Sequence, residues 1–414
     1  MHHNTFSYAF LTLLAAGLGI ATPVGKPSLV TTFKVNLSDE TPRMLKLIKE
    51  SKLPDEPEYP GIGSTFGIDL DVLKGLKQQW LHDFDWNKQQ DEINKYNHFT
   101  TKIENLDIHF IHHKSSSPDA IPLLLLHGWP GSFLEFLPLI NPLTSPKNTT
   151  SPSFHIIIPS LPGFAFSSAP PANWTNADTA RIFNTLMTSI LGYEKYAIHA
   201  TDWGADVGYS LYGNYNTTVR AGHFAFIPFF PLNGAQLAEE GVVLESELER
   251  FELEMAEEWR RTGNGYFILQ STKPNTIGLA LSDNPVGQLA WIGEKMIDWS
   301  DPRAGSGPSV LDRRELLTGV SLFYLTKSFV SSTFIYAQNP NGFKDEYTKA
   351  ATDAPLLFSA FKYNVGFWPP AKVAQVGNLV SYRNHDFGGH FPGLDNPAAL
   401  VEDLREITTY WVTS

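Results

Sequence analysis

The chain has 414 residues, a length that suits one large domain carrying an insertion. It is 42% hydrophobic and only 18% charged, which excludes an intrinsically disordered protein, and its formal net charge of -12 argues against nucleic acid and anionic membrane surfaces as partners. The chain contains no cysteine, so disulfides, thiolate metal sites and cysteine nucleophiles are excluded.

The first 21 residues differ in composition from the rest. Residues 6–21 form an apolar run, short for a membrane-spanning helix, that ends before Thr22-Pro23 in a plausible cleavage context. We therefore expect a secretory leader over residues 1–21. Basic residues are missing ahead of the run, which leaves an N-terminal anchor in the endoplasmic reticulum membrane as the alternative. No second long apolar segment follows, so we expect a soluble, secreted body.

Glycosylation is compatible with this route, because four sequons occur in the chain. Their asparagines are Asn36, Asn148, Asn173 and Asn216.

The remaining chain divides into four parts. Residues 22–105 are polar and helix-like, with Pro54, Pro57 and Pro60 interrupting a meander over the surface. Residues 106–230 and 345–414 contain apolar strand patterns that alternate with helical ones, which predicts a mostly parallel, doubly wound α/β sheet. Between them, residues 231–344 are helical and charged, which predicts an inserted helical lid. The expected strands cover residues 106–112, 122–126, 154–159, 196–200, 223–229, 355–361 and 379–382, and a helix over 397–412 closes the sheet.

Three histidines in the first of these strands were considered as metal ligands. His109 and His113 share one face of the strand and His112 points to the other. Because no carboxylates accompany them at ligand spacing, we expect a structural or surface role and no metal site.

The strongest chemical signal is Asp202, which ends the apolar run 196–200 and precedes Trp203 and Gly204. A buried strand, a tight turn with small residues and a following helix are typical of a nucleophile elbow, here with a carboxylate in place of serine. On its own, an aspartate at this position is more often a helix N-cap.

Two further segments support the nucleophile. Upstream, His127-Gly-Trp-Pro-Gly-Ser132 follows a buried strand and can supply an oxyanion loop, and His390 follows Gly388-Gly389 near the C-terminus. Oxyanion loop, nucleophile and histidine thus occur in the order that an α/β-hydrolase fold requires. An aspartate nucleophile forms an alkyl ester at a carbon that bears a leaving oxygen or halide.

Several motifs resemble those of the microsomal-type epoxide hydrolases, from about Thr41 to the end of the chain. Residues 80–112 resemble the amino-terminal extension of that family, and residues 127–136 match its oxyanion segment. Gly265-Tyr266-Phe-Ile-Leu-Gln270 and Ser331-Ser-Thr-Phe-Ile-Tyr336 resemble the segments that carry its two lid tyrosines.

The resemblance implies an enzyme that converts a small hydrophobic epoxide and water into a vicinal diol, without cofactor or metal, as in detoxification. Asp202 would attack the epoxide while Tyr266 and Tyr336 protonate its oxygen. His390 would activate the water that hydrolyses the ester. The backbone N–H groups of Trp129 and Trp203 would bind the oxyanion.

One position departs from the family pattern. Where the family places a carboxylate to orient the histidine, this chain has Asn364, whose amide can accept the imidazole N–H but cannot stabilise imidazolium by charge. Asp386 and Asp353 are candidate substitutes. The alternatives to an active epoxide hydrolase are a catalytically impaired binding protein and a haloalkane dehalogenase.

Overall fold

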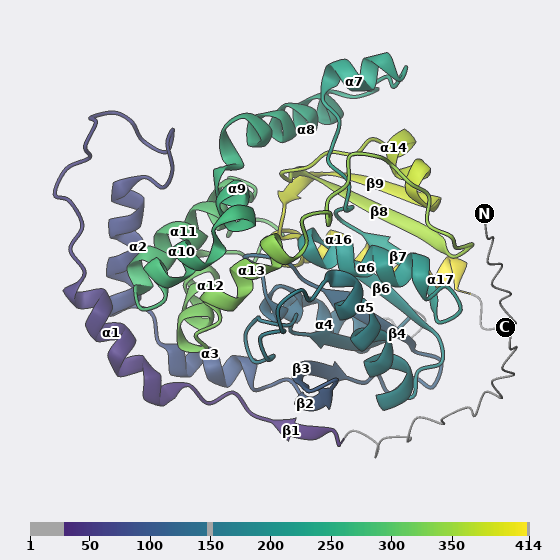
Figure 1. Cartoon of the computed structure of the whole chain (residues 1–414), viewed down its shortest axis with the longest axis horizontal. Helices are drawn as coiled ribbons and strands as arrows, with labels where there is room; N and C mark the ends of the chain where they lie inside the picture. Colours follow the sequence, from purple (N-terminus) through teal and green to yellow (C-terminus); the bar gives the residue numbers. More distant parts are fainter. Residues whose placement is uncertain (1–28, 147–151, 412–414) are drawn as a thin grey trace, which may run out of the picture.

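A nine-stranded sheet forms the centre of the molecule, in the order β1-β2-β3-β5-β4-β6-β7-β8-β9 (Figure 1). The computed structural model describes residues 29–146 and 152–411. Strands β3 to β8 carry the expected apolar runs, most of whose residues are buried on both faces of the sheet, whereas β9 is mostly part-buried. The strands are β1 (Thr31–Phe33), β2 (His98–Ile103), β3 (Leu106–His113), β4 (Ile121–Leu126), β5 (Phe154–Pro159), β6 (Tyr196–Ala200), β7 (Val219–Phe224), β8 (Pro355–Tyr363) and β9 (Asn378–Gly389).

The prediction of a mostly parallel sheet is confirmed. Strand β4 pairs in parallel with β5 and β6, and β6 to β9 continue in parallel. The pairs β1–β2, β2–β3 and β3–β5 are antiparallel. A parallel sheet brings the carboxyl ends of its strands to one edge, where ligand sites of doubly wound folds lie.

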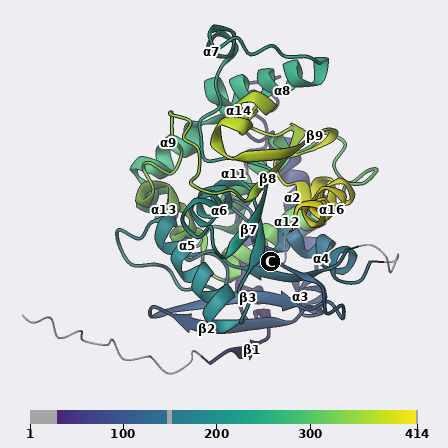
Figure 2. The ribbon, with the colours of Figure 1, turned by 90° about the vertical axis from the view of Figure 1, so that its right-hand side faces the viewer.

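Helices cover both faces of this sheet (Figures 1 and 2). On one face, a Cβ on Gly208 of α6 (Asp202–Asn214) would lie 2.7 Å from the Ala200 Cβ, and α5 (Asn176–Thr185) packs on α6. On the other face, His199 contacts Phe136 just before α4 (Leu137–Thr144), and α16 (Pro397–Arg405) packs on α4. His199 and Ala200, adjacent residues of β6, thus contact the helix layers on opposite faces of the sheet, because side chains alternate along a strand.

The N-terminal part is less helical than predicted. Besides α1 (Thr41–Glu50), α2 (Leu70–His82) and α3 (Trp86–Ile93), it contains β1 and β2, which extend the sheet beyond β3. These strands were missed because β1 is short and β2 carries polar residues on a half-exposed edge. The region is anchored by Trp80, whose indole N–H donates a hydrogen bond to the Ser321 hydroxyl at 3.0 Å.

Residues 234–338 form a series of helices, which we call the lid helices. Figure 1 shows α7 and α8 projecting from the body, whereas α9 to α13 lie together beside α2 and α3. The lid helices are α7 (Gly234–Glu239), α8 (Glu247–Glu258), α9 (Gly265–Thr272), α10 (Pro274–Leu281), α11 (Pro285–Asp298), α12 (Arg313–Leu325) and α13 (Phe329–Gln338).

Two strands, β7 and β9, differ from the sequence prediction by more than two residues; β7 already begins at Val219. Strand β7 ends at Phe224, because the carbonyl of the next residue, Ala225, accepts a hydrogen bond from the Asn364 side chain instead of continuing the ladder. Strand β9 runs on to Gly389, although its second half is polar. Short helices α14 (Pro370–Val376), α15 (Pro392–Asp395) and α17 (Ile407–Tyr410) complete the C-terminal part.

The predicted leader over residues 1–21 lies outside the described residues. Across residues 29–146 and 152–411, none of the helices has the length and apolarity that a membrane span requires.

Candidate active site

Asp202 stands at a sharp turn between β6 and α6. Its φ of +46° lies in the left-handed region, which a non-glycine residue adopts only at a cost in strain. The turn is held close to β4, since a Cβ on Gly204 would lie 2.3 Å from the Leu126 carbonyl oxygen. A strained residue between a central strand and a helix is the geometry of a nucleophile elbow, and it presents the buried carboxylate at the carboxyl edge of the sheet.

The loop after β4 contacts this carboxylate directly. The Trp129 backbone N–H donates a hydrogen bond of 2.7 Å to Asp202 Oδ1, and a Cβ on Gly128 would lie only 2.0 Å from the same oxygen. The predicted oxyanion loop is therefore in place, and glycine at 128 permits its close approach. Trp203, the second expected donor, directly follows Asp202 in α6, and its ring lies edge-on to Tyr336 with centroids 4.9 Å apart.

His127 fixes the start of the loop. Its Nε2 accepts a hydrogen bond from the Leu161 backbone N–H at 3.2 Å, which requires a neutral ring. Burial lowers the pKa of His127 to about 4, so the ring is neutral at physiological pH. The loop after β5 thereby positions the loop that holds Asp202.

His390 lies on the other side of the nucleophile. Its Nε2 is 3.4 Å from Asp202 Oδ2, and its Nδ1 is 2.8 Å from Asn364 Oδ1. The Asn364 amide nitrogen donates to the Ala225 carbonyl at 3.0 Å, which turns the amide oxygen toward the imidazole. Nδ1 therefore carries the proton that it donates to Asn364, and Nε2 is the ring nitrogen that faces Asp202.

The structure brings neither proposed substitute acid to His390. Asp353 forms an exposed ion pair with Arg220 at 2.9 Å. Asp386 is exposed, and its backbone carbonyl accepts a hydrogen bond from Arg303. Asn364 itself is the group that contacts the histidine.

Both expected tyrosines reach the site from the lid helices. Tyr266 on α9 stacks on the Trp129 ring with centroids 5.3 Å apart, and Tyr336 on α13 lies edge-on to the same ring at 5.7 Å. The two phenol rings lie 5.9 Å from each other. Burial, reinforced by the Asp202 charge, raises the pKa of Tyr266 and of Tyr336 well above the ordinary value, so both hydroxyls stay protonated.

A small cavity of about 30 Å³ adjoins the nucleophile. Within the described part of the chain, Tyr336 Oη and Trp259 Nε1 in its wall have no hydrogen-bond partner, and neither has His390 Nε2 beside Asp202. Buried polar atoms without partners mark positions for water or ligand. The cavity is lined by Asp202, Trp203, Phe226, Phe229, Phe230, Pro231, Trp259, Tyr266, Phe267, Tyr336, Phe343 and Val365.

The sequence did not single out the aromatic wall of this cavity or Glu135. Phe267 directly follows Tyr266, so its position next to a lid tyrosine was the available signal. Glu135 lies inside the oxyanion segment but was not distinguished from an ordinary exposed glutamate; it is only 2% exposed.

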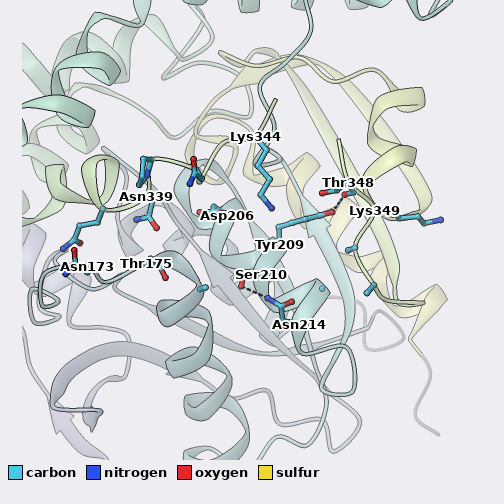
Figure 3. Close-up of a pocket in the computed structure, with 18 of the residues that line it drawn as sticks. Asn173, Thr175, Asp206, Tyr209, Ser210, Asn214, Asn339, Lys344, Thr348 and Lys349 are labelled. Atoms are coloured by element: carbon cyan, nitrogen blue, oxygen red, sulfur yellow. Dashed lines mark hydrogen bonds between the residues drawn. The ribbon is translucent and has the colours of Figure 1, made fainter. Parts of the chain in front are cut away.

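A larger groove of about 830 Å³ lies outside this cavity (Figure 3). It contains Asp206, one helical turn after the nucleophile, together with Tyr209 and Lys344. Burial raises the pKa of Asp206 to about 6, and the Asn176 amide donates to its carboxylate at 2.8 Å. Asp202, Tyr266 and Tyr336 line the smaller cavity, so that cavity, and not the groove, is the candidate active site.

The histidines of β3 have structural contacts. His109 is fully buried, with Nε2 2.9 Å from His98 Nδ1 and Nδ1 2.8 Å from the Ser160 hydroxyl. His112 contacts the Tyr193 hydroxyl at 2.9 Å. In the part of the chain that the structure describes, no group of three or more histidine or acidic side chains could hold a metal ion.

Comparisons with known proteins agree with the site. Residues 30–136 match the family described as the epoxide hydrolase N terminus, and residues 121–239 match the α/β-hydrolase fold. Epoxide hydrolase 1 of Sus scrofa is 33% identical over 94% of this chain and 91% of its own.

Solved structures show the same likeness. The Aspergillus niger epoxide hydrolase has a TM-score of 0.81 at 33% identity, over 93% of this chain and 97% of its own. The juvenile hormone epoxide hydrolase of Bombyx mori also has a TM-score of 0.81, at 27% identity over 92% of this chain and 94% of its own. These matches favour the epoxide hydrolase interpretation over the dehalogenase and the non-catalytic binding protein. The chain belongs to the epoxide hydrolase family and is an enzyme of that class.

Proposed function

We propose that the enzyme opens its epoxide through a covalent ester on Asp202, which a water activated by His390 then hydrolyses. The observation that carries this proposal is the placement of Asp202 between the Trp129 N–H, 2.7 Å from Oδ1, and the His390 Nε2, 3.4 Å from Oδ2. One carboxylate oxygen is thus held by an amide, and the other faces the base.

In the first step, Oδ2 of Asp202 bonds to an epoxide carbon and the bond from that carbon to the ring oxygen breaks. The leaving oxygen takes a proton from the Tyr266 or Tyr336 hydroxyl, which leaves a tyrosinate. A phenol of raised pKa suits this step, because it stays protonated beside the Asp202 charge and gives up its proton only to a strongly basic alkoxide.

In the second step, water attacks Cγ of the ester and gives one proton to His390 Nε2. The negative charge that develops on Oδ1 is stabilised by the Trp129 N–H, and we assign the Trp203 N–H as the second donor. When the bond between Cγ and Oδ2 breaks, the departing oxygen takes the proton from imidazolium. The second proton of the water restores the tyrosine, so the enzyme ends unchanged.

The substrate that the cavity favours is an apolar epoxide. Phenylalanine and tryptophan side chains line most of the wall, and the polar groups are the nucleophile and the two tyrosines. A substrate larger than a few atoms requires the lid side chains to move apart, since the free volume is about 30 Å³.

Isotope labelling tests the ester. A single turnover with enzyme in excess in ¹⁸O-water should give a diol without ¹⁸O and a peptide containing Asp202 that has gained one ¹⁸O atom. Direct attack of water on the epoxide would instead put ¹⁸O into the diol during that turnover, and would overturn the proposal. Asp202→Ala is the control variant and should form neither product.

We further propose that the chain enters the secretory pathway and is glycosylated. Asn36 and Asn173 are exposed, whereas the Asn216 amide nitrogen donates to the Ala351 carbonyl at 2.7 Å. Expression in a eukaryotic secretory host should therefore give glycans at Asn36 and Asn173, detected as deamidation after enzymatic deglycosylation. Their absence at both positions would contradict this route.

A further inference from the structure

Glu135 packs between the two loops that carry the catalytic groups. It lies in the 3-10 turn Phe133–Phe136 after the oxyanion loop, and its Oε2 is 3.0 Å from where a Cβ on Gly131 would stand. On its other side, a Cβ on Gly393 would lie 2.4 Å from the Glu135 carbonyl oxygen and 3.3 Å from its Cγ. Gly393 opens α15, three residues after His390. The glutamate therefore lies against both the loop of Trp129 and the loop of His390.

The carboxyl group of Glu135 is buried, and one of its oxygens has no hydrogen-bond partner among the described residues. It is 2% exposed, and that oxygen is Oε1. Burial, and then the nearby Asp202 charge, raises the pKa of Glu135 well above its ordinary value. A buried carboxyl beside a carboxylate is stable only in its neutral form, and even then it requires a partner.

A second unpartnered atom also lies beside the nucleophile. His390 Nε2 is buried, 3.4 Å from Asp202 Oδ2, and has no hydrogen-bond partner among the described residues. A water between polar groups of this kind satisfies both. It would also occupy the position from which the ester carbon of Asp202 is attacked.

We propose that Glu135, as a neutral carboxylic acid, binds the hydrolytic water together with His390. The assignment rests on the ester mechanism proposed above. The water donates one hydrogen to His390 Nε2 and the other to the Glu135 carbonyl oxygen, which leaves a lone pair directed at Cγ of the ester. Glu135 neither gains nor loses a proton; the proton of the attacking water passes to His390.

The neutral form explains why an acid can occupy this place. An ionised Glu135 would repel Asp202 in the free enzyme and disfavour the reactive carboxylate. A neutral acid is compatible with both the free and the esterified nucleophile, and it offers the same carbonyl acceptor in both states.

The test compares two nearly isosteric variants. In Glu135→Gln a carbonyl oxygen remains, whereas Glu135→Met retains the bulk but removes both oxygens. Enzyme is mixed with excess styrene oxide, and rapid-quench intact mass follows the formation and breakdown of the Asp202 ester. We expect Glu135→Met to slow ester breakdown about 100-fold, because the hydrolytic water would lose its position. Ester formation should stay within about threefold of wild type. Gln should break the ester down within a few-fold of wild type.

The rates in these variants distinguish a water-binding role of Glu135 from a structural role and from failure of the ester mechanism. Ester breakdown at the wild-type rate in Glu135→Met would overturn the proposal, and so would equal losses in Met and Gln, because an ionised carboxylate would then be needed. Equal slowing of both steps in Met would show a structural role only. Absence of any ester in the wild type would contradict the proposed mechanism instead. Glu315→Met, at a part-buried glutamate of α12, is the control and should leave both steps unchanged.

Infrared difference spectra of wild type against Glu135→Gln give a readout that does not need the Met variant to fold. We expect the band of a protonated carboxyl at neutral pH in the wild type, absent from the variant. A carboxylate band in its place would overturn the proposal.

Discussion

The two sides of Asp202 are built from different chemistry. On the Oδ1 side, the Trp129 N–H lies 2.7 Å away, and two tyrosines pack on the Trp129 ring. On the Oδ2 side stands one histidine, whose supporting partner is a neutral amide, Asn364, at 2.8 Å. The first side, which we call the alkylation side, offers the Tyr266 and Tyr336 hydroxyls to the epoxide oxygen. Its Trp129 N–H acts only in the second step, on the charge that develops on Oδ1. The second side, the water side, offers no negative charge to the imidazolium that must form.

The difference locates the slow step. The two tyrosine hydroxyls are placed in advance to donate to the epoxide oxygen as its negative charge develops, so alkylation should be fast. An amide fixes the tautomer of His390 but lacks the charge that stabilises its protonated form, so ester hydrolysis should be slow.

Removing the base, His390, should stop ester hydrolysis while ester formation continues. We expect His390→Gln to form the Asp202 ester at close to the wild-type rate and to lose ester hydrolysis by about 10³-fold or more, within the range of general base catalysis. Intact mass spectrometry after mixing with epoxide should show a persistent adduct. An unmodified variant that still produces diol would refute the role of His390.

The lid tyrosines should have the opposite effect. Tyr266→Phe and Tyr336→Phe keep the rings that pack on Trp129 but remove the acid, so each should slow alkylation by about 10²-fold, and the double variant should slow it further. Ester breakdown should change much less. Single-turnover rates measure both steps, and unchanged alkylation in both single variants would mean that the tyrosines only pack.

Restoring a carboxylate on the water side should help only modestly. Asn364→Asp adds the missing charge but replaces the amide nitrogen, which donates to the Ala225 carbonyl at 3.0 Å, by an oxygen that this carbonyl repels. We expect ester breakdown to rise by up to about tenfold, far below the roughly 10⁴-fold Asp–Asn effect in a serine protease. Alkylation should be unchanged. Asn364→Ala is the matched control and should slow breakdown; faster breakdown in both variants would refute the contrast.

A smaller effect, on the pH dependence of protein stability, is expected at Glu252, which contacts the strand that ends just before His390. Glu252 of α8 accepts a hydrogen bond from Asn384 of β9 at 2.8 Å, and burial raises its pKa from 4.5 to about 8. The folded protein thus keeps a proton that the unfolded chain releases, so the free energy of unfolding falls as pH rises from 4.5 to about 8.

Glu252→Gln mimics the protonated form and should remove this pH dependence. One pKa unit corresponds to about 1.4 kcal/mol, so the variant should be more stable than wild type by at least about 1 kcal/mol near pH 8, and similar to it near pH 5. Denaturant titrations at the two pH values measure this. A wild-type stability that rises across the interval would contradict the sign.

The main chemistry of the site could be predicted from local sequence. Asp202 follows a buried strand and precedes Trp203-Gly204, a local pattern that predicts the turn, although contacts with β4 hold it in place. Asn364 could be placed because the resemblance to the family, aligned over the segments on either side of it, puts the residue that orients the histidine there. The orientation of its amide could not be predicted, since it depends on Ala225, a residue 139 positions away.

Features that arise from packing between distant segments were not predictable. The burial of Glu135 depends on Gly393, which a sequence pattern cannot bring beside residue 135. Strand β2 depends on pairing with β3, and β1 on pairing with β2, because their own residues do not alternate strongly. The aromatic wall of the cavity combines residues of α9, η4 (Trp259–Gly263) and the loop that contains Phe343.

The most direct test of the central contrast is a rapid-quench experiment on the wild-type enzyme with saturating epoxide. Intact mass should show a burst of about one equivalent of Asp202 ester, formed faster than the steady-state turnover, with the ester as the main enzyme form thereafter. Unmodified enzyme throughout turnover, with diol appearing linearly from the start, would show that alkylation limits the rate and would contradict the account.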